Sequence, residues 1–342
     1  MTIAAILCEY NPLHAGHRRH IELTKAEGFD AVVGVMSGNF VQRGDLAIYD
    51  KWARAKSAVD AGMNLVVEIP TACVLQSAQG YAESGVALMA ALHAAVVSFG
   101  SECGDAALLD RAALTLSQRL DAVKAEMEKG LSYPVACKAA LGELGFLLDT
   151  PNNTLGIEYC AAIRRQGLSI TPFSVLRDPA SERASLLRAK LYGGEGTHEM
   201  KYLDRAMLAR LRTLSPEYYV TLPDVTEGLE NRIWAAVREA LTVDEVIDRV
   251  CTKRYTKARI RRILLRAFLD LPDVPTPSAL RVLALDRVGR KVIKEAALPA
   301  VTKAARADLA LEARCTDLYA LGTKHPHPCG EEYTKEIYYR DH

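Results

Sequence analysis

The first 26 residues join an apolar run, a short polar loop and a helical pattern in direct succession. Residues 3–7 are all apolar, which is typical of a buried strand. Residues 21–26 continue as a helix, so the loop brings His14, Gly16 and His17 to a helix N-terminus. Unpaired backbone N–H groups and the helix dipole attract anions there, and Gly16 lets a ligand approach the backbone. This order favours a nucleotide triphosphate site over two histidines placed by chance.

The alternation of strand and helix continues through the first half of the chain. Apolar runs at 31–36, 65–70 and 95–100 alternate with helical patterns at 50–62 and 78–92, and a fifth run covers 169–176. Parallel strands that are buried on both faces have continuous apolar runs, so we expect an α/β fold with a Rossmann-like parallel sheet. The loops that start at Glu9, Ser37, Pro70 and Gly100 then share the sheet edge where such folds bind ligands.

Length and composition predict two soluble domains. The chain has 342 residues, of which 49% are hydrophobic and 25% charged. We place a catalytic, ATP-binding domain at 1–192 and a mostly helical domain, without strong alternating strands, at 193–342. There is no apolar stretch of about 18 residues and no basic leader at the N-terminus. Eight scattered cysteines without a Cys-x-x-Cys pair favour a reduced, cytoplasmic protein and argue against a zinc site.

A second candidate phosphate-binding element follows the fifth strand. Ser185 and Arg188 lie at the start of a helical pattern, where a hydroxyl and a guanidinium can hold phosphate oxygens. Ser-Leu-Leu-Arg is also an ordinary helix with its apolar side packed. Its position at the same sheet edge as His14 and His17 is what favours a function. Arg183 precedes it, so Ser185 is the only hydroxyl residue at this motif.

These motifs together resemble a known superfamily. His14-x-Gly16-His17 with a late Ser-x-x-Arg resembles the nucleotidyltransferases that share the HIGH-type motif with class I aminoacyl-tRNA synthetases. More narrowly, residues 1 to about 290 resemble the bacterial tRNA(Met) cytidine acetate ligase family, which implies a HUP-type catalytic domain. The segments that carry this resemblance are Glu9-Tyr10-Asn11-Pro12-x-His14-x-Gly16-His17, Met36 to Gly44, Lys51-Trp52-Ala53-Arg54, Glu68-Ile69-Pro70, Phe99-Gly100-Ser101-Glu102, 151–159 and 253–256.

The resemblance implies an ATP-dependent ligase. Members of that family activate acetate as acetyl-adenylate, release pyrophosphate, and acetylate N4 of the wobble cytidine of elongator tRNA(Met) to give N4-acetylcytidine. The implied partners are ATP, acetate and elongator tRNA(Met), with Mg²⁺ accompanying the triphosphate and with neither a tightly bound cofactor nor a dedicated metal site. Two alternatives stay open from the residues alone. One is a small-molecule adenylyltransferase acting on a phosphate-bearing metabolite, and the other is a non-catalytic RNA-binding protein.

The order of the motifs implies a residue set for ATP. We expect His14, His17 and Lys51 to be catalytic, and motif order leaves the choice between Asn152 and Asn153 open. The residues expected to bind ATP are Leu7, Glu9, Asn11, Pro12, His14, Gly16, His17, His20, Gly100, Asn153, Arg177, Ser185 and Arg188.

The loop after the second strand is a candidate for acetate or cytosine binding, because it lies past a strand end. The residues expected to contact acetate or the cytosine edge are Ser37, Asn39, Gln42 and Arg43. The alternative is a loop that is polar only because it is exposed. On the next helix we expect Lys51 and Arg54 to form an exposed basic stripe that serves the same edge, although such stripes are usually only solvated faces.

The net charge of +1 hides a basic segment. Between Lys253 and Lys291, eleven Lys and Arg residues stand against three Asp residues, a local charge of +8. Clustered cations beside an aromatic residue, here Tyr255, are typical of a surface that binds a nucleic-acid backbone. The candidate tRNA contacts are Lys253, Arg254, Lys257, Arg259, Arg262 and Arg266. The alternative is a helix with one buried apolar side and one solvated basic side.

Overall fold

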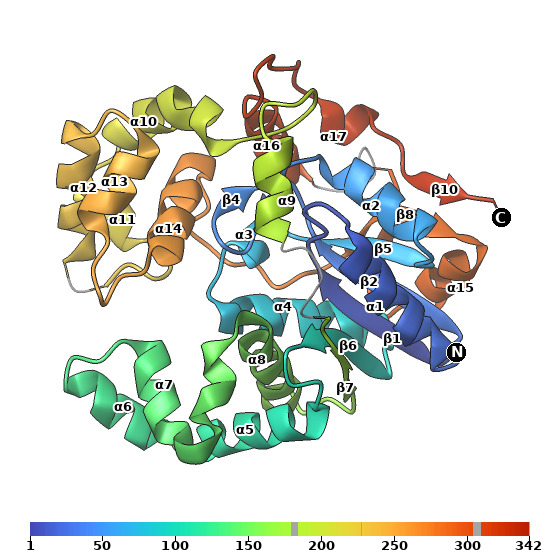
Figure 1. Ribbon diagram of the computed structural model, residues 1–342. Coiled ribbons are helices and arrows are strands. Elements are labelled where there is room, and N and C mark those ends of the chain that lie inside the picture. Colours follow the sequence, from blue (N-terminus) through green and yellow to red (C-terminus); the bar gives the residue numbers. More distant parts are fainter. Residues whose placement is uncertain (179–183, 227, 304–308, 342) are drawn as a thin grey trace.

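The computed structural model describes residues 1–178, 184–226, 228–303 and 309–341. Within these ranges the strands form an eight-stranded sheet in the order β10-β8-β5-β2-β1-β6-β7, with β9 beside β8 (Figure 1). The strands are β1 (Ile3–Cys8), β2 (Ala31–Ser37), β5 (Leu65–Ile69), β6 (Val96–Ser101), β7 (Thr171–Leu176), β8 (Leu280–Asp286), β9 (Ala300–Val301) and β10 (Tyr338–Arg340). The first five of these run parallel, and β8 pairs antiparallel with β5.

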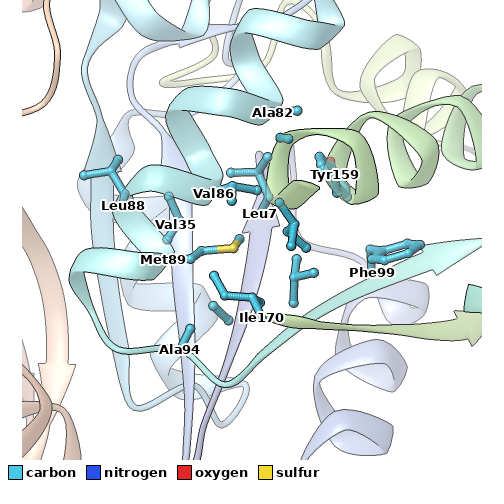
Figure 2. Close-up of a cluster of buried hydrophobic side chains, with 14 of the residues drawn as sticks. Leu7, Val35, Ala82, Val86, Leu88, Met89, Ala94, Phe99, Tyr159 and Ile170 are labelled. Atoms are coloured by element: carbon cyan, nitrogen blue, oxygen red, sulfur yellow. The ribbon is translucent and has the colours of Figure 1, made fainter. Parts of the chain in front are cut away.

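Helices cover both faces of the sheet. In the first half they are α1 (Ala15–Ala26), α2 (Lys51–Asp60), α3 (Thr71–Val74), α4 (Ala78–Ala91), α5 (Ala106–Gln118), α6 (Leu120–Glu128), α7 (Tyr133–Leu141), the 3₁₀ helix η1 (Gly142–Asp149), α8 (Pro151–Arg165) and α9 (Ala184–Leu191). Alternate residues of a strand point to opposite faces. Leu7 therefore packs under α4 and α8 (Figure 2), whereas Ile6 joins the cluster beneath α1 and α2. The continuous apolar runs therefore arise from strands that are buried on both faces.

The two halves of the parallel sheet diverge at β1. Its neighbours are β2 on one side and β6 on the other, and the later strands continue outward from each. The loops after β1 and β6 therefore leave the carboxyl edge of the sheet at the point where open α/β folds have the crevice that binds ligands. The histidine loop follows β1, so the fold places it in this crevice.

A helical layer packs against the same edge of the sheet. It contains the 3₁₀ helix η2 (Met200–Leu203), α10 (Asp204–Arg212), α11 (Pro216–Val220), α12 (Leu229–Glu239), α13 (Val243–Val250) and α14 (Lys257–Leu269). Its apolar core includes Phe40 and Leu46 from a hairpin of β3 (Phe40–Val41) and β4 (Asp45–Leu46), together with Ala72 and Leu75 around α3. The helical layer and the loops at this edge of the sheet therefore share one core.

The chain returns to the sheet after α14, which differs from the expectation of helices beyond residue 193. After α14 come β8, β9 and β10 with the helices α15 (Arg287–Glu295), α16 (Ala310–Tyr319) and α17 (Glu331–Thr334). Arg281 interrupts the apolar pattern of β8, yet its side chain is buried beside Glu332, so the strand lies in the interior despite that charge. The domain division at 192/193 remains a prediction. Across the described ranges, none of the helices is long and apolar enough to span a bilayer.

Candidate nucleotide-binding site

The loop between β1 and α1 is organised by its histidines. His14 is the N-cap of α1, and its Nδ1 accepts a hydrogen bond from the backbone N–H of Gly16 at 3.1 Å. The His14 and His17 rings stack with their centroids 3.7 Å apart, and Tyr10 meets His17 edge-on at 5.1 Å. Two imidazoles are thus fixed at the positive end of the α1 dipole, as an anion site requires.

Burial keeps the imidazoles of His17 and His20 neutral. Burial, with further contributions from His14, His20 and Arg177, holds the pKa of His17 well below its usual value. Burial and then Arg177 lower the pKa of His20 to about 4, and its Nε2 lies 2.9 Å from Oγ of Ser98 on β6. A hydrogen bond with the backbone of Pro12 opposes this lowering of the His17 pKa. A neutral ring offers one N–H donor to a phosphate oxygen and leaves the positive charge to nearby arginines.

The ends of β6 and β7 bring one such arginine to the site. Arg177 directly follows β7, and its backbone N–H donates to the carbonyl of Ser101 at 3.0 Å. A Cβ on Gly100 would lie 3.3 Å from Cγ of Arg177, so the glycine leaves room for this side chain against the strand end. The guanidinium lies 3.9 Å from a carboxylate oxygen of Glu102. The structure therefore brings Gly100 and Arg177 together with His17 and His20, as predicted.

The two asparagines at the start of α8 order the loop after β6. Oδ1 of Asn153 accepts from the backbone N–H groups of Glu102 and Cys103 at 3.0 and 3.1 Å. Nδ2 of Asn152 donates to the Glu102 carboxylate at 2.6 Å, and the backbone N–H of Asn153 donates to its other oxygen at 3.0 Å. Asn153 is buried, so here it supports the loop, and direct contact with ATP remains a prediction for either asparagine.

Other members of the predicted ATP set build the β1–α1 loop. Oδ1 of Asn11 accepts from the backbone N–H of Ile48 at 2.8 Å, and Oε1 of Glu9 accepts from that of Gln42 at 2.8 Å. Burial raises the pKa of Glu9. Pro12 is buried in the turn, and Leu7 lies in the core against Gly85, so the Leu7 side chain does not face the crevice.

The late motif lies next to the first one. Nη1 of Arg188 on α9 donates to the backbone carbonyl of Asn11 at 2.7 Å, which ties α9 to the histidine loop. Ser185 is exposed at the start of α9. Arg183 lies outside the described residues. Arg188 therefore lies beside the histidine loop, as predicted for the Ser185–Arg188 element.

Comparison with known proteins shows the family. Residues 1–193 and 182–333 match the model of the HIGH nucleotidyl transferase family. A tRNA(Met) cytidine acetate ligase from Acetivibrio thermocellus is 32% identical over 98% of this chain and 99% of the relative. One from Clostridium botulinum, strain Langeland, is 34% identical over 86% of each chain. The chain belongs to the tRNA(Met) cytidine acetate ligase family.

Solved structures agree with this membership. The crystal structure of Thermotoga maritima TmcAL bound with alpha-thio ATP is 25% identical, covers 99% of both chains and gives a TM-score of 0.92. The apo form of the same protein gives a TM-score of 0.89. The resemblance and the α/β fold class are therefore confirmed over the whole length of the chain, beyond the residue at about 290 where the recognised motifs end.

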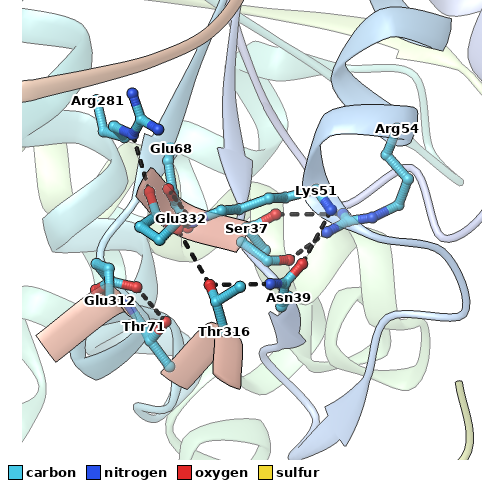
Figure 3. Close-up of polar contacts among 11 residues, drawn as sticks. Ser37, Asn39, Lys51, Arg54, Glu68, Thr71, Arg281, Glu312, Thr316 and Glu332 are labelled. Carbon is cyan, nitrogen blue, oxygen red and sulfur yellow. Dashed lines mark hydrogen bonds and ion pairs between the residues drawn. The ribbon is translucent and has the colours of Figure 1, made fainter. Parts of the chain in front are cut away.

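In this member of the family, Lys51 is a structural residue, and the expected exposed stripe on α2 is wrong. Lys51 has no exposed surface, and its Nζ lies 2.7 Å from Glu68 and 2.6 Å from Glu332 (Figure 3). Arg54 is also buried and donates to the carbonyls of Glu9 and Ser37, among others. Because two carboxylates enclose the ammonium group, Lys51 has no access to a substrate.

The residue that could have indicated the burial of Lys51 lies in β5. Glu68 stands in an otherwise apolar strand, and a carboxylate inside a sheet needs a cation beside it. Burial raises the pKa of Glu68, and the adjacent Lys51 opposes this rise. Glu332, the second partner, comes from α17 at the far end of the chain, so no local pattern could show the pairing.

The loop after β2 is mostly a support. Ser37 and Asn39 are buried. Oγ of Ser37 lies 3.2 Å from the Tyr81 hydroxyl, and Oδ1 of Asn39 accepts from the backbone N–H of Lys51 at 2.9 Å. Gln42 is half-buried between Glu9 and the carbonyl of Gln76. Of the four residues predicted to meet acetate or cytosine, Arg43 is exposed.

The basic segment divides into exposed and buried members. Lys253 and Arg254 are exposed, and Lys257 is exposed with its Nζ 2.6 Å from Asp248. Half-buried Arg259 donates to the carbonyl of Asp224.

Two predicted tRNA contacts are wrong in position. Arg262 and Arg266 are 8% and 1% exposed. Arg266 donates to the carbonyls of Ala72 and Leu75 and so joins α14 to α3. The prediction failed because a spacing of three or four residues identifies a common helix face but not whether that face is solvated.

Proposed function

We propose that this chain is an ATP-dependent ligase that activates acetate as acetyl-adenylate. It then acetylates N4 of the wobble cytidine of elongator tRNA(Met) in the cytoplasm, which gives N4-acetylcytidine. The names of the relatives and the nucleotide analogue in the Thermotoga maritima structure support this assignment. The observation that carries it is the stacked pair of His14 and His17 at the α1 N-terminus, with Arg177 beside it and Arg188 of α9 bonded to the same loop.

The first step suits these side chains. An acetate oxygen attacks the α-phosphorus of ATP, the bond to the β-phosphate bridge breaks, and pyrophosphate leaves. Negative charge builds on the α-phosphate oxygens, and donors that are already oriented stabilise it without reorganising. The neutral His17 ring supplies an N–H donor, the α1 N-terminus adds backbone N–H groups, and Arg177 supplies a fixed positive charge.

The second step transfers the acetyl group. The N4 amine of cytidine attacks the carbonyl carbon of acetyl-adenylate, the bond to the AMP oxygen breaks, and the amine loses one proton. The cytidine must leave its stack to reach this carbon, because an enzyme that modifies a base takes it out of the helix or loop. The exposed cations Lys253, Arg254 and Lys257 are the candidates to hold the RNA backbone beside the site.

Magnesium would arrive with the triphosphate. In the described part of the chain there is no group of three or more His, Cys, Asp or Glu side chains that could hold a metal ion. The nucleotide site presents histidine and arginine nitrogens, whereas Mg²⁺ prefers oxygen ligands and keeps several waters. These residues do not suit a resident magnesium ion, so the ion belongs to the substrate.

ATP–pyrophosphate exchange in the presence of acetate tests the first step. We expect acetate-dependent exchange by the wild-type protein, loss of exchange in His17→Ala, and normal exchange in His325→Ala, which changes an exposed histidine far along the chain. Nucleoside mass spectrometry of elongator tRNA(Met) then tests acetylation. Normal exchange in folded His17→Ala would remove His17 from the site. Failure of acetate exchange, with AMP transfer to a phosphate-bearing metabolite, would support the adenylyltransferase instead.

A further inference from the structure

A cavity of about 190 Å³ lies between the N-terminal turns of α1 and α2. His17 and His20 face the other flank of α1, since His20 reaches Ser98 on β6. Arg18 follows His17 by one residue, a rotation of about 100° around the helix, and lines the cavity instead. The turn of Pro12 and Leu13 forms another wall. The residues that separate the cavity from the nucleotide crevice are therefore those of the histidine loop itself.

The walls of the cavity combine an aromatic ring, cations and apolar surface. Tyr49 and Ser57 line it from the α2 side, and Arg54 forms part of its wall. Arg54 is fixed, because its guanidinium donates to the carbonyls at the ends of β1 and β2 and its Nε donates to the carbonyl of Tyr49 at 2.9 Å. This hydrogen bond holds the backbone of Tyr49, which positions the residue at the cavity wall.

The charge of the cavity is positive. Arg18 is exposed, and within the described ranges no acidic side chain pairs with its guanidinium or lines the cavity. The cavity volume of about 190 Å³ is below the roughly 300–1,000 Å³ of sites that hold drug-sized ligands, so it suits a group smaller than a nucleoside triphosphate, such as a single base. A flat base against Tyr49 with its phosphate near Arg18 satisfies both the shape and the charge.

We propose that this cavity binds the base of a nucleotide directly adjoining the reactive cytidine of the RNA. The inference rests on the proposed function and extends it with a second nucleotide site. The reactive cytidine belongs on the His17 flank of α1, where ATP is activated, so we assign a base on the Arg18 flank to an adjoining nucleotide. Unstacked loop nucleotides are commonly held on aromatic side chains, and holding the neighbour would keep the cytidine extruded.

The test compares Tyr49→Leu and Arg18→Ala with Arg19→Ala, which removes the next exposed cation on α1 but does not line the cavity. Three elongator tRNA(Met) transcripts are used: intact, abasic on the 5′ side of the cytidine, and abasic on its 3′ side. For each combination of protein and transcript, the dissociation constant of the complex is measured over a series of salt concentrations. Acetate-dependent exchange without RNA is measured in the same preparations.

We expect Tyr49→Leu to bind intact RNA about tenfold more weakly than the wild type, because one stacking contact is lost. The wild-type protein should bind one of the two abasic transcripts about tenfold more weakly than intact RNA. Tyr49→Leu should bind that abasic transcript almost as well as it binds intact RNA. Arg18→Ala should reduce the slope of log affinity against log salt concentration by about one, because one phosphate contact is lost. Arg19→Ala should leave this slope unchanged, because Arg19 is solvated.

Three results would overturn the cavity assignment. These are equal losses for the abasic transcripts with wild type and Tyr49→Leu, equal effects of Arg18→Ala and Arg19→Ala, and a fall in exchange as large as the fall in RNA affinity. Absence of acetate exchange in the wild type would instead refute the proposed ligase. RNA affinity and its abasic coupling are measured without catalysis, so failure of the cavity assignment is distinguishable from failure of the proposed function.

Discussion

The contact between Gly44 and α14 allows a quantitative prediction. Gly44 lies at the tip of the β3–β4 hairpin with φ +77°, and a Cβ there would lie 2.7 Å from both Cβ of Arg261 and the backbone N of Arg262. The left-handed conformation costs an L-residue about 1–2 kcal/mol, and forcing a methyl group against a helix backbone costs about 1–3 kcal/mol more. We therefore expect Gly44→Ala to lower the free energy of unfolding by about 2–5 kcal/mol.

Gly28→Ala is the matched control. Gly28 has φ +84°, but a Cβ there would have nothing within 4 Å, so only the conformational cost of about 1–2 kcal/mol applies. Urea unfolding measures both variants, with a lower midpoint at unchanged slope as the signature of lost stability. The hairpin also carries Gln42, whose N–H bonds Glu9, so Gly44→Ala should also weaken ATP binding. Equal destabilisation by the two substitutions would refute the contact argument.

Two further predictions concern buried charge. Lys51→Met leaves Glu68 and Glu332 without their shared cation and should cost about 3–5 kcal/mol in urea unfolding, whereas Lys56→Met, at an exposed ion pair, should change little. A small effect of Lys51→Met would mean that the carboxylates find other partners. The pKa of His20 falls from 6.5 to about 4 on folding, so the unfolded chain takes up a proton first and stability drops by about 3 kcal/mol between pH 6.5 and 4. His20→Gln should make that part of the stability–pH curve shallower, because His17 still contributes to it, and an unchanged curve would contradict the assigned pKa.

The parts that the sequence predicted well are those whose partners lie nearby in the chain. His14 caps α1 by accepting a hydrogen bond from the backbone N–H of Gly16, only two residues later in the chain. The strand before His14 is a continuous apolar run. Arg177 and Gly100 lie together, as expected for the ends of parallel strands that share one edge, whereas their contact with ATP stays a prediction. Strand-end position is therefore the property that made the site recognisable.

The errors concern long charged side chains. Lys51, Arg54 and Arg266 were expected at the surface because cations usually are. Each is buried, with partners that come from distant parts of the chain or from backbone carbonyls. A carbonyl oxygen is present at every residue and leaves no mark in the sequence. The return of the chain to the sheet at β8 was missed for a related reason, since Arg281 breaks the apolar pattern of that strand.

The ion pair between Lys51 and Glu332 also sets an order of events for the chain as it is made. Lys51 and Glu68 leave the ribosome long before Glu332, and β8 and β10 are likewise among the later segments. Until α17 emerges, the interior below the nucleotide loop lacks one of its charges and part of its sheet. Domains usually fold from the N-terminus as they are synthesised. Here the first-made half lacks these partners at that stage, so ATP binding should begin only after α17 has emerged.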